Sequence, residues 1–308
     1  MKTPRNTPIC IFSTFLNSLL RGISQVMLQN NWVSGLVFLI GIFFNSTLLG
    51  IGAFVGALVS TLTAHLIKAD ATSIKNGLFG FNGVLVAIAL LHFLDPSPLV
   101  WGYMIFATSC STVIAVACMK LTDTWKIPAF TFPFVVTTLC FLLAHPYFGA
   151  IHPNENLPTA NFSELSVPFF LKALPQGVSQ VFFQKNTISG ILFLIALLIS
   201  SGRSFLLGVL GSTVGIIVAW GMGADQLLIG SGVFGFNAVL TAIAVGDQFH
   251  KISLGAVFYV LSATILATVM FATLSTAFAP IGVPPLTLPF VLVSWIFLLS
   301  KLHTQKSL

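Results

Sequence analysis

Two threonines, each held between prolines, are the residues best placed to act on a small polar solute. They occur in the repeated pattern Pro-x-x-Thr-x-Pro-Phe, within IPAFTFPF at 127–134 and VPPLTLPF at 283–290. Proline removes a backbone donor, so carbonyl oxygens near Thr131 and Thr287 are expected to lose their helical partners. At membrane depth such oxygens are tolerated where they face protein or a water-filled path. The alternative is that the prolines only begin helices, but two symmetric copies favour a pore lined by acceptors.

Glutamines form a second repeated polar pattern. Gln25 and Gln29 are four residues apart, as are Gln180 and Gln184, so each pair is predicted to share one helix face. Glutamines commonly form hydrogen bonds between helices in bundles, and this is the alternative. A symmetric pair on two short segments favours a solute path.

The chemistry expected of an enzyme or an ion-coupled carrier is missing from the apolar segments. All 7 acidic residues fall in predicted loops or in the connector: Asp70, Asp95, Asp123, Glu155, Glu164, Asp225 and Asp247. Proton- or sodium-coupled carriers usually need a carboxylate within the membrane. The sequence also lacks a Walker motif, a metal cluster and a nucleophile–base pair. We therefore predict no enzyme activity, no cofactor and no metal, and a path for an uncharged polar solute that moves down its gradient.

The composition indicates a polytopic α-helical membrane protein. Of 308 residues, 56% are hydrophobic and 6% are charged, with a mean hydropathy of +1.00. A soluble domain carries roughly a quarter charged residues. The net charge of +6 fits loops that orient a membrane protein and does not require nucleic acid. No cleavable signal peptide precedes the first apolar run, and the four cysteines are expected to act as small hydrophobic residues.

The chain contains two similar halves. ISQVMLQNNWVSG at 23–35 shares seven of 13 positions with VSQVFFQKNTISG at 178–190, an offset of 178 − 23 = 155. GLFGFNGVLVAIA at 77–89 recurs as GVFGFNAVLTAIA at 232–244 with the same offset. Asn82 and Asn237 in these segments are predicted to bond backbone, and the adjacent glycines to allow close helix packing.

Loop charges indicate that the two halves are inverted. The loop at Lys68 and Lys75 is basic, whereas its counterpart at Asp225 lacks Lys and Arg; the loop at Asp95 lacks them, whereas its counterpart carries Lys251. By the positive-inside rule, equivalent loops then lie on opposite sides. This predicts an inverted repeat with a pseudo-two-fold axis in the membrane plane.

The predicted fold is an all-α polytopic membrane protein with two inverted five-helix repeats, each with one re-entrant half-helix, enclosing a central pore. The first repeat, 1–149, is predicted to hold a re-entrant segment at 12–29 and spans near 33–48, 50–67, 77–94, 99–119 and 130–149. An extracytoplasmic connector covers 150–167. The second repeat, 168–308, is predicted to hold a re-entrant segment at about 168–184 and spans near 188–201, 204–221, 232–246, 252–278 and 286–301. Both termini are expected in the cytoplasm.

These motifs resemble the urea transporter family. The paired proline–threonine pattern, the Gln-x-x-x-Gln segments and the GLFGFN segments carry the resemblance, which covers essentially the whole membrane chain. Ile127 and Val283 stand where the family signature begins with Leu. The resemblance implies a homotrimer with one pore in each subunit, built from inverted halves.

The resemblance also implies roles for individual residues. It implies amide ends at Gln25 and Gln180, a central threonine pair, and a slot between phenyl rings. The slot residues would be Phe81, Phe236, Leu28 and Phe183, with the centre narrowed by Leu85 and Leu240. Leu28 departs from the family, where an aromatic residue is usual, so one end of the slot is expected to hold a flat solute less closely.

The sequence therefore predicts facilitative, channel-like transport of urea. Urea is flat and neutral, with four N–H donors and one strong acceptor, so a flat slot with acceptor oxygens suits it. The alternatives are a secondary active transporter of a small amide or amine, and an intramembrane enzyme such as an amidase. The short termini favour a bacterial inner (cytoplasmic) membrane protein in contact with membrane lipid.

Overall fold

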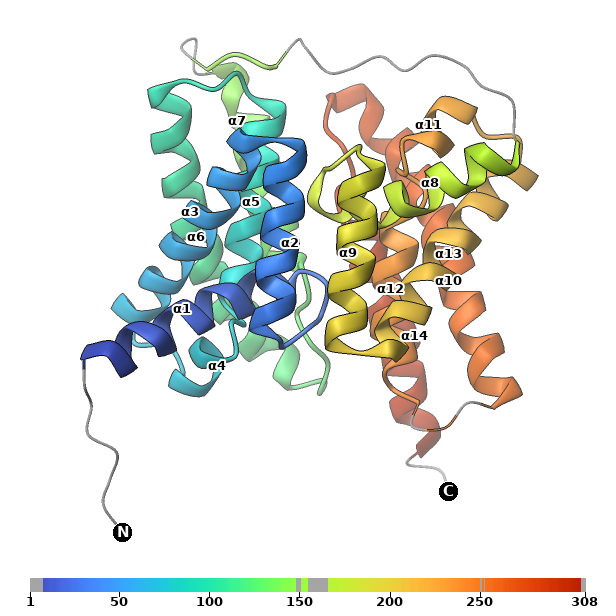
Figure 1. The fold of residues 1–308 in the computed structure, drawn as a ribbon, viewed down its shortest axis with the longest axis horizontal. Coiled ribbons are helices and arrows are strands. Elements are labelled where there is room, and N and C mark those ends of the chain that lie inside the picture. The colour runs from blue at the N-terminus through green and yellow to red at the C-terminus, as the bar shows by residue number, and fades with distance from the viewer. Residues whose placement is uncertain (1–7, 148–150, 155–165, 250, 252, 306–308) are drawn as a thin grey trace.

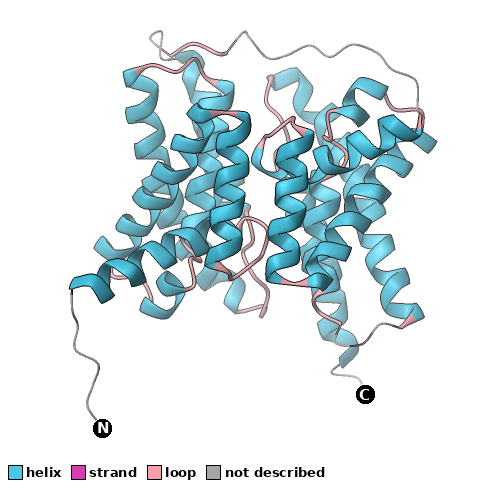
Figure 2. Cartoon of the chain, viewed as in Figure 1, coloured by secondary structure: helices cyan, strands magenta, loops and turns pink. Residues whose placement is uncertain are grey.

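A computed structural model describes residues 8–147, 151–154, 166–249, 251 and 253–305. Within these ranges the chain forms fourteen α-helices and no β-strand (Figure 2). The helices of the first half are α1 (Pro8–Gln25), α2 (Trp32–Asn45), α3 (Thr47–Leu66), α4 (Ala71–Lys75), α5 (Gly80–Phe93), α6 (Pro98–Asp123) and α7 (Phe132–Ala144). Those of the second half are α8 (Val167–Ser179), α9 (Thr187–Ser200), α10 (Gly202–Gly221), α11 (Gln226–Gly230), α12 (Phe236–Gly246), α13 (Leu254–Phe278) and α14 (Leu288–Gln305).

The two halves repeat the same order of helices in opposite orientations, which confirms the predicted fold class. In Figure 1, α1 lies obliquely along the lower side of the molecule and α2 then rises, whereas α8 lies along the upper side and α9 then descends. The start of α1 and the end of α14 lie at the same edge. Each of the ten expected spans overlaps one helix of ten or more residues. The 155–165 part of the connector lies outside the described residues.

Helix length separates two kinds of apolar helix. Among the described residues, α3, α6, α10 and α13 are long and apolar enough to cross a membrane alone. By contrast, α7 has 13 residues, about 20 Å at 1.5 Å per residue, which is shorter than a bilayer core of about 30 Å. The shorter helices α5, α7 and α12 are entered from non-helical segments that lie inside the protein. In the second half, Val167–Phe182 and Thr187–Ser200 are bent by 75° at the break between them, as a re-entrant segment requires.

Reciprocal hydrogen bonds join the halves at α2 and α9, which lie side by side in Figure 1. Ser34 Oγ donates to Ala196 O at 2.8 Å, and Ser189 Oγ donates to Gly41 O at 2.8 Å. The pairs are related by the repeat offset, since 34 + 155 = 189 and 41 + 155 = 196. The two bonds therefore exchange under the pseudo-two-fold axis.

Close glycine contacts fix α1 against α5 and α8 against α12. A Cβ added to Gly80 would lie 2.9 Å from Gly22 Cα, and one added to Gly235 would lie 2.6 Å from Gly177 Cα. Both approaches are too close for any side chain larger than hydrogen, so the predicted role of Gly80 and Gly235 in packing is confirmed. This packing places the starts of α5 and α12 against the ends of α1 and α8.

Candidate solute path between the two halves

Thr131 and Thr287 meet where the two halves join. Their Oγ1 atoms are 2.6 Å apart, so one hydroxyl donates to the other, and both side chains are almost fully buried. Thr131 immediately precedes α7, and Thr287 immediately precedes α14. The family resemblance implied a central threonine pair, and the structure joins the two threonines in one hydrogen bond.

Left-handed backbone turns the chain just before each threonine. The φ angle is 50° at Phe130 and 52° at Leu286, a conformation that costs a residue with a Cβ about 1–2 kcal/mol. Pro133 then lies in the first turn of α7, as Pro289 does in α14. Pro133 and Pro289 thus begin helices, as the alternative held, whereas Pro128, Pro284 and Pro285 lie in the non-helical segments before them.

Several carbonyls near the prolines have protein partners, including Ala129 O, which accepts from Phe132 N, and Pro285 O, which accepts from Leu288 N. Two more accept from side chains. Trp295 Nε1 donates to Pro128 O at 2.9 Å, and Asn237 Nδ2 donates to Leu286 O at 3.2 Å. The expectation of unpaired acceptors is wrong for these oxygens.

Gln29 and Gln184 do not share a helix face with Gln25 and Gln180, so that prediction is wrong. α1 ends at Gln25, and Gln29 lies beyond a turn in which Gln29 Nε2 donates to Met27 O at 2.8 Å. The repeat is kept in the second half, where Gln184 Nε2 donates to Phe182 O at 2.6 Å. Gln29 and Gln184 are buried supports of the turn.

The turns present Leu28 and Phe183 in left-handed conformation. The φ angle is 60° at Leu28 and 59° at Phe183, so each side chain leaves the turn away from the helix before it. Ser24 Oγ donates to Gln29 O at 2.6 Å to close the first turn, and Ser179 does the same for Gln184 at 2.5 Å. Leu28 and Phe183 are therefore held by hydrogen-bonded turns, whereas Phe81 and Phe236 lie in the first turns of α5 and α12.

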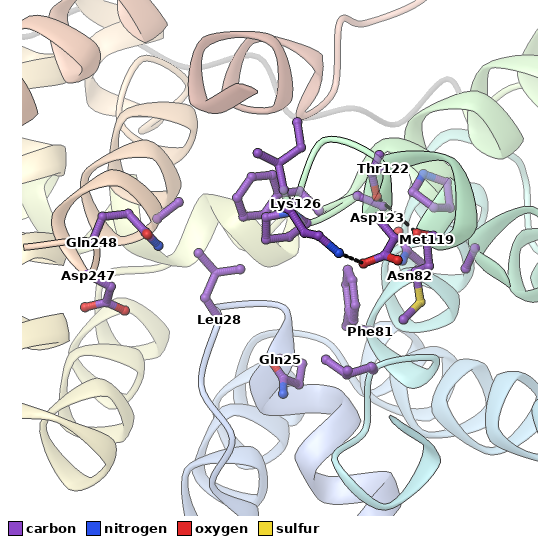
Figure 3. A pocket seen from close by; sticks show the side chains of 18 residues that line it. Gln25, Leu28, Phe81, Asn82, Met119, Thr122, Asp123, Lys126, Asp247 and Gln248 are labelled. Carbon is purple, nitrogen blue, oxygen red and sulfur yellow. Dashed lines mark hydrogen bonds and ion pairs between the residues drawn. The ribbon is translucent and has the colours of Figure 1, made fainter. Parts of the chain in front are cut away.

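A cavity of about 590 Å³ opens at what we call the Gln25 mouth, defined by Gln25, Leu28 and Phe81 (Figure 3). It continues past Asn82 to Phe130, the neighbour of Thr131. The structure thus brings three of the five predicted first-half residues, Gln25, Leu28 and Phe81, onto one cavity that reaches the neighbour of Thr131. Gln25 Nε2 donates to Asn76 O at 3.0 Å, which fixes the orientation of the amide.

Residues of the second half also line this cavity. Asp247 and Gln248, at the end of α12, face it from the side opposite Asp123 and Lys126 (Figure 3). Burial raises the pKa of Asp247, and the nearby Arg203 guanidinium opposes part of that rise. Sequence reasoning missed Asp247 and Gln248 because only the packing of the halves places them at this mouth.

The Gln180 mouth, defined by Gln180, Phe183 and Phe236, is packed with aromatic rings. Phe183 lies 5.6 Å from His92 and 5.8 Å from Phe93, ring centre to ring centre. Phe236, at the start of α12, contacts Phe271 at 5.6 Å. Gln180 is 9% exposed, and its Oε1 is buried without a hydrogen-bond partner. A buried acceptor without a partner is costly unless a ligand donates to it.

The remaining predicted residues lie inside the helix packing of α5 and α12. Leu85 and Leu240 are fully buried, each four residues after a slot phenylalanine on the same helix face. Asn82 Oδ1 accepts from Phe134 N at 3.0 Å, and Asn237 Oδ1 accepts from Phe290 N at 3.1 Å. The predicted backbone role of both asparagines is confirmed, and these bonds tie α5 to α7 and α12 to α14.

Comparison with known proteins identifies the family. Residues 16–302 match the family described as urea transporter. Urea transporter 1 of sheep (Ovis aries) is 32% identical over 295 residues, which cover 92% of this chain and 77% of the relative. Urea transporter 1 of Rattus norvegicus and of Mus musculus align with the same identity and coverage. Because the family match spans most of the chain, this chain belongs to the urea transporter family.

Proposed function

We propose that this protein conducts urea down its gradient through a path between its two halves. It is a multi-pass membrane transport protein and not an enzyme, as its family is one of transport proteins. The observation that carries the proposal is the buried Thr131–Thr287 pair, since the cavity at the Gln25 mouth ends one residue away from it.

Each part of the path would handle one property of urea. Phe81 with Leu28, and Phe236 with Phe183, would bound a flat solute on its two faces. Gln25 and Gln180 would offer amide oxygens to N–H groups at the two mouths, and the threonine hydroxyls would do so at the centre, where Leu85 and Leu240 narrow the path. Each hydrogen bond left unmade in a dry site costs about 1–3 kcal/mol, while sites in a conducting pore must also release the solute.

The positions of the carboxylates support uncoupled transport. The described acids lie at helix ends or in loops: Asp70, Asp95, Asp123, Asp225 and Asp247. A gradient-driven carrier usually holds a carboxylate within the membrane. This arrangement favours a channel over a secondary active transporter of an amide or amine.

We further infer that both termini are cytoplasmic, that the connector at 150–167 is extracytoplasmic, and that the protein is a homotrimer in the inner membrane. The basic loops support the orientation, and α1 begins at the same edge at which α14 ends (Figure 1). Single cysteines would be placed in the connector and near Lys301. A thiol reagent applied to one face of the membrane should then modify only one of the two positions. Labelling of both from the same side would contradict the inverted repeat.

Flux into proteoliposomes tests the function. Urea should enter faster than thiourea and glycerol, with formamide as a smaller planar amide for comparison, and the rate should not change with a proton or sodium gradient. Uphill accumulation of urea driven by either gradient would contradict the channel and favour the coupled carrier. Protein-free liposomes provide the control for leak.

A further inference from the structure

A groove on the outer surface of the second half combines two cations with an apolar floor. We call it the basic groove and define it by Arg203, Leu206, Leu210, Lys251, Val257 and Val260. Its volume is about 310 Å³, and it is separate from the cavity of the Gln25 mouth. The groove lies between the first turns of α10 and α13, two helices that are adjacent in Figure 1.

The cations and the apolar residues occupy different levels of the groove. Arg203 and Lys251 lie at the starts of α10 and α13, and the apolar residues follow along both helices. Leu206 and Leu210 are four residues apart on α10, and Val257 and Val260 are three apart on α13, so each pair shares a face. From Arg203 to Leu210 the apolar wall extends about 10 Å. Leu206 is 65% exposed and Val257 is 41% exposed.

The charge at this edge exceeds what the protein itself neutralises. Arg203 Nη2 donates to Gly246 O, and Arg203 Nε lies 4.0 Å from Asp247 Oδ1, yet the Arg203 side chain remains 40% exposed. A guanidinium has five donors, so it can bind an anion while keeping the Gly246 contact. Lys251 is exposed, and Lys301 lies nearby over the Phe249 ring. Arg203, with one carboxylate at 4.0 Å, and the exposed Lys251 thus lie beside the positive ends of two helices.

The symmetry-related place in the first half keeps apolar residues but lacks the guanidinium of Arg203. Leu48 stands in place of Arg203, since 203 − 155 = 48. The second half gains one residue after its 232–244 segment, so the offset there is 156, and Trp101 stands in place of Val257, since 257 − 156 = 101. The end of α5 is covered by the chain itself, because Asp95 N donates to His152 O at 2.8 Å and Asn154 N donates to Phe93 O at 2.9 Å. The basic groove is therefore specific to the second half.

We propose that the basic groove binds one anionic phospholipid, with its phosphate between Arg203 and Lys251 and an acyl chain along Leu206 and Val257. Basic pockets between membrane helices suit acidic headgroups, and the apolar wall distinguishes a lipid from a free anion. The phosphate would compete with Asp247 for Arg203. Since Asp247 lines the cavity of the Gln25 mouth, occupancy of the groove would change the charge at that mouth.

Lipid binding to the full chain tests the proposal without a flux assay, so its outcome is independent of the proposed function. Native mass spectrometry would compare phosphatidylglycerol with phosphatidylcholine on the wild type, Arg203→Gln and Lys251→Gln. Phosphatidylglycerol should bind preferentially, and each substitution should weaken it about fivefold. Lys172→Gln, which removes an exposed cation on α8, is the matched control and should bind as the wild type does.

Two further arms separate the headgroup from the chain. Val257→Trp, which introduces the residue found at the first-half position, should abolish preferential binding although both cations remain; Arg203→Lys, which keeps the charge, should retain most of it. Glycerol 3-phosphate should not displace the lipid. The proposal is overturned if Arg203→Gln and Lys251→Gln both bind phosphatidylglycerol like the wild type, or if glycerol 3-phosphate displaces it. Unfolding curves in phosphatidylcholine show which variants are folded. If Val257→Trp does not fold, the binding measurements on Arg203→Gln and Lys251→Gln decide the proposal.

Discussion

The Gln25 mouth and the Gln180 mouth have the same backbone conformation but differ in how open they are. Both use a helix that ends at or before a glutamine, a left-handed residue three positions later, and a buried turn. At the first mouth the left-handed residue is Leu28, and a cavity of about 590 Å³ lies beside it. At the second mouth it is Phe183, which packs against His92 and Phe93.

The difference arises from residues that each half supplies to the other. Asp247 and Gln248 of the second half line the Gln25 mouth, and their repeat positions in the first half are His92 and Phe93, since 247 − 155 = 92. Polar side chains line the cavity at the Gln25 mouth, and aromatic rings close around Phe183 at the Gln180 mouth. The repeated backbone thus fixes the turns at both ends, and substitutions at a few paired positions determine how openly each end is packed.

The largest expected effect is at the centre, which both mouths share. Thr131→Val and Thr287→Val each remove the same Thr–Thr hydrogen bond and one acceptor. An unmade hydrogen bond in a buried site costs about 1–2 kcal/mol, which is roughly a five- to thirtyfold loss of urea flux. Stopped-flow measurement should give similar losses for the two variants, and Thr→Ser, which keeps the oxygen, should retain most of the flux. If both valine variants conducted urea at the wild-type rate, the threonines would contribute only to packing.

Substitution of the glutamines should lower urea flux by different amounts at the two mouths. Gln180→Met should lower urea flux by about five- to tenfold, because the buried Oε1 has no protein partner and water cannot easily replace it. Gln25→Met should cost less, about two- to threefold, because water in the cavity can take over its hydrogen bonds. Gln180→Glu keeps an acceptor and is the control. A larger loss at Gln25 than at Gln180 would reverse the comparison.

Exchange of the slot residues should alter selectivity more than rate. Phe183→Leu should raise thiourea flux relative to urea by about two- to fivefold, and Leu28→Phe should lower it, since small changes in an apolar wall discriminate modestly. Parallel flux assays with the two solutes measure the ratio. No change in the ratio for either variant would remove both residues from the path.

The smallest effect on flux is expected at the α2–α9 contact. Ser34→Ala and Ser189→Ala should each lower the free energy of unfolding by about 1 kcal/mol, equally, because the bonds are related by the pseudo-axis. Thermal unfolding in detergent measures this, and urea flux should stay near the wild-type rate. Clearly unequal losses would show that the halves are not equivalent at this contact.

Much of the fold could be predicted from the sequence, because repeated apolar runs and the offset of 155 fix the number, order and orientation of the main helices. The backbone roles of Asn82 and Asn237 were predictable for the same reason. The left-handed turns were not, because Leu28 and Phe183 carry no glycine or asparagine signal for that conformation. The family resemblance implied a central threonine pair, but the direct hydrogen bond between Thr131 and Thr287 depends on how the halves pack, which no local pattern encodes.

The central claim is that solute passes between Thr131 and Thr287, and a reversible crosslink tests it most directly. In a background without the four native cysteines, Thr131→Cys and Thr287→Cys would be combined, since the hydroxyls now lie 2.6 Å apart. Oxidation should form a disulfide across the path, abolish urea flux, and allow recovery with a thiol reductant. Each single variant should be insensitive to the oxidant. Full urea flux through protein whose crosslink is verified by mass would contradict the account, because the path would then lie elsewhere.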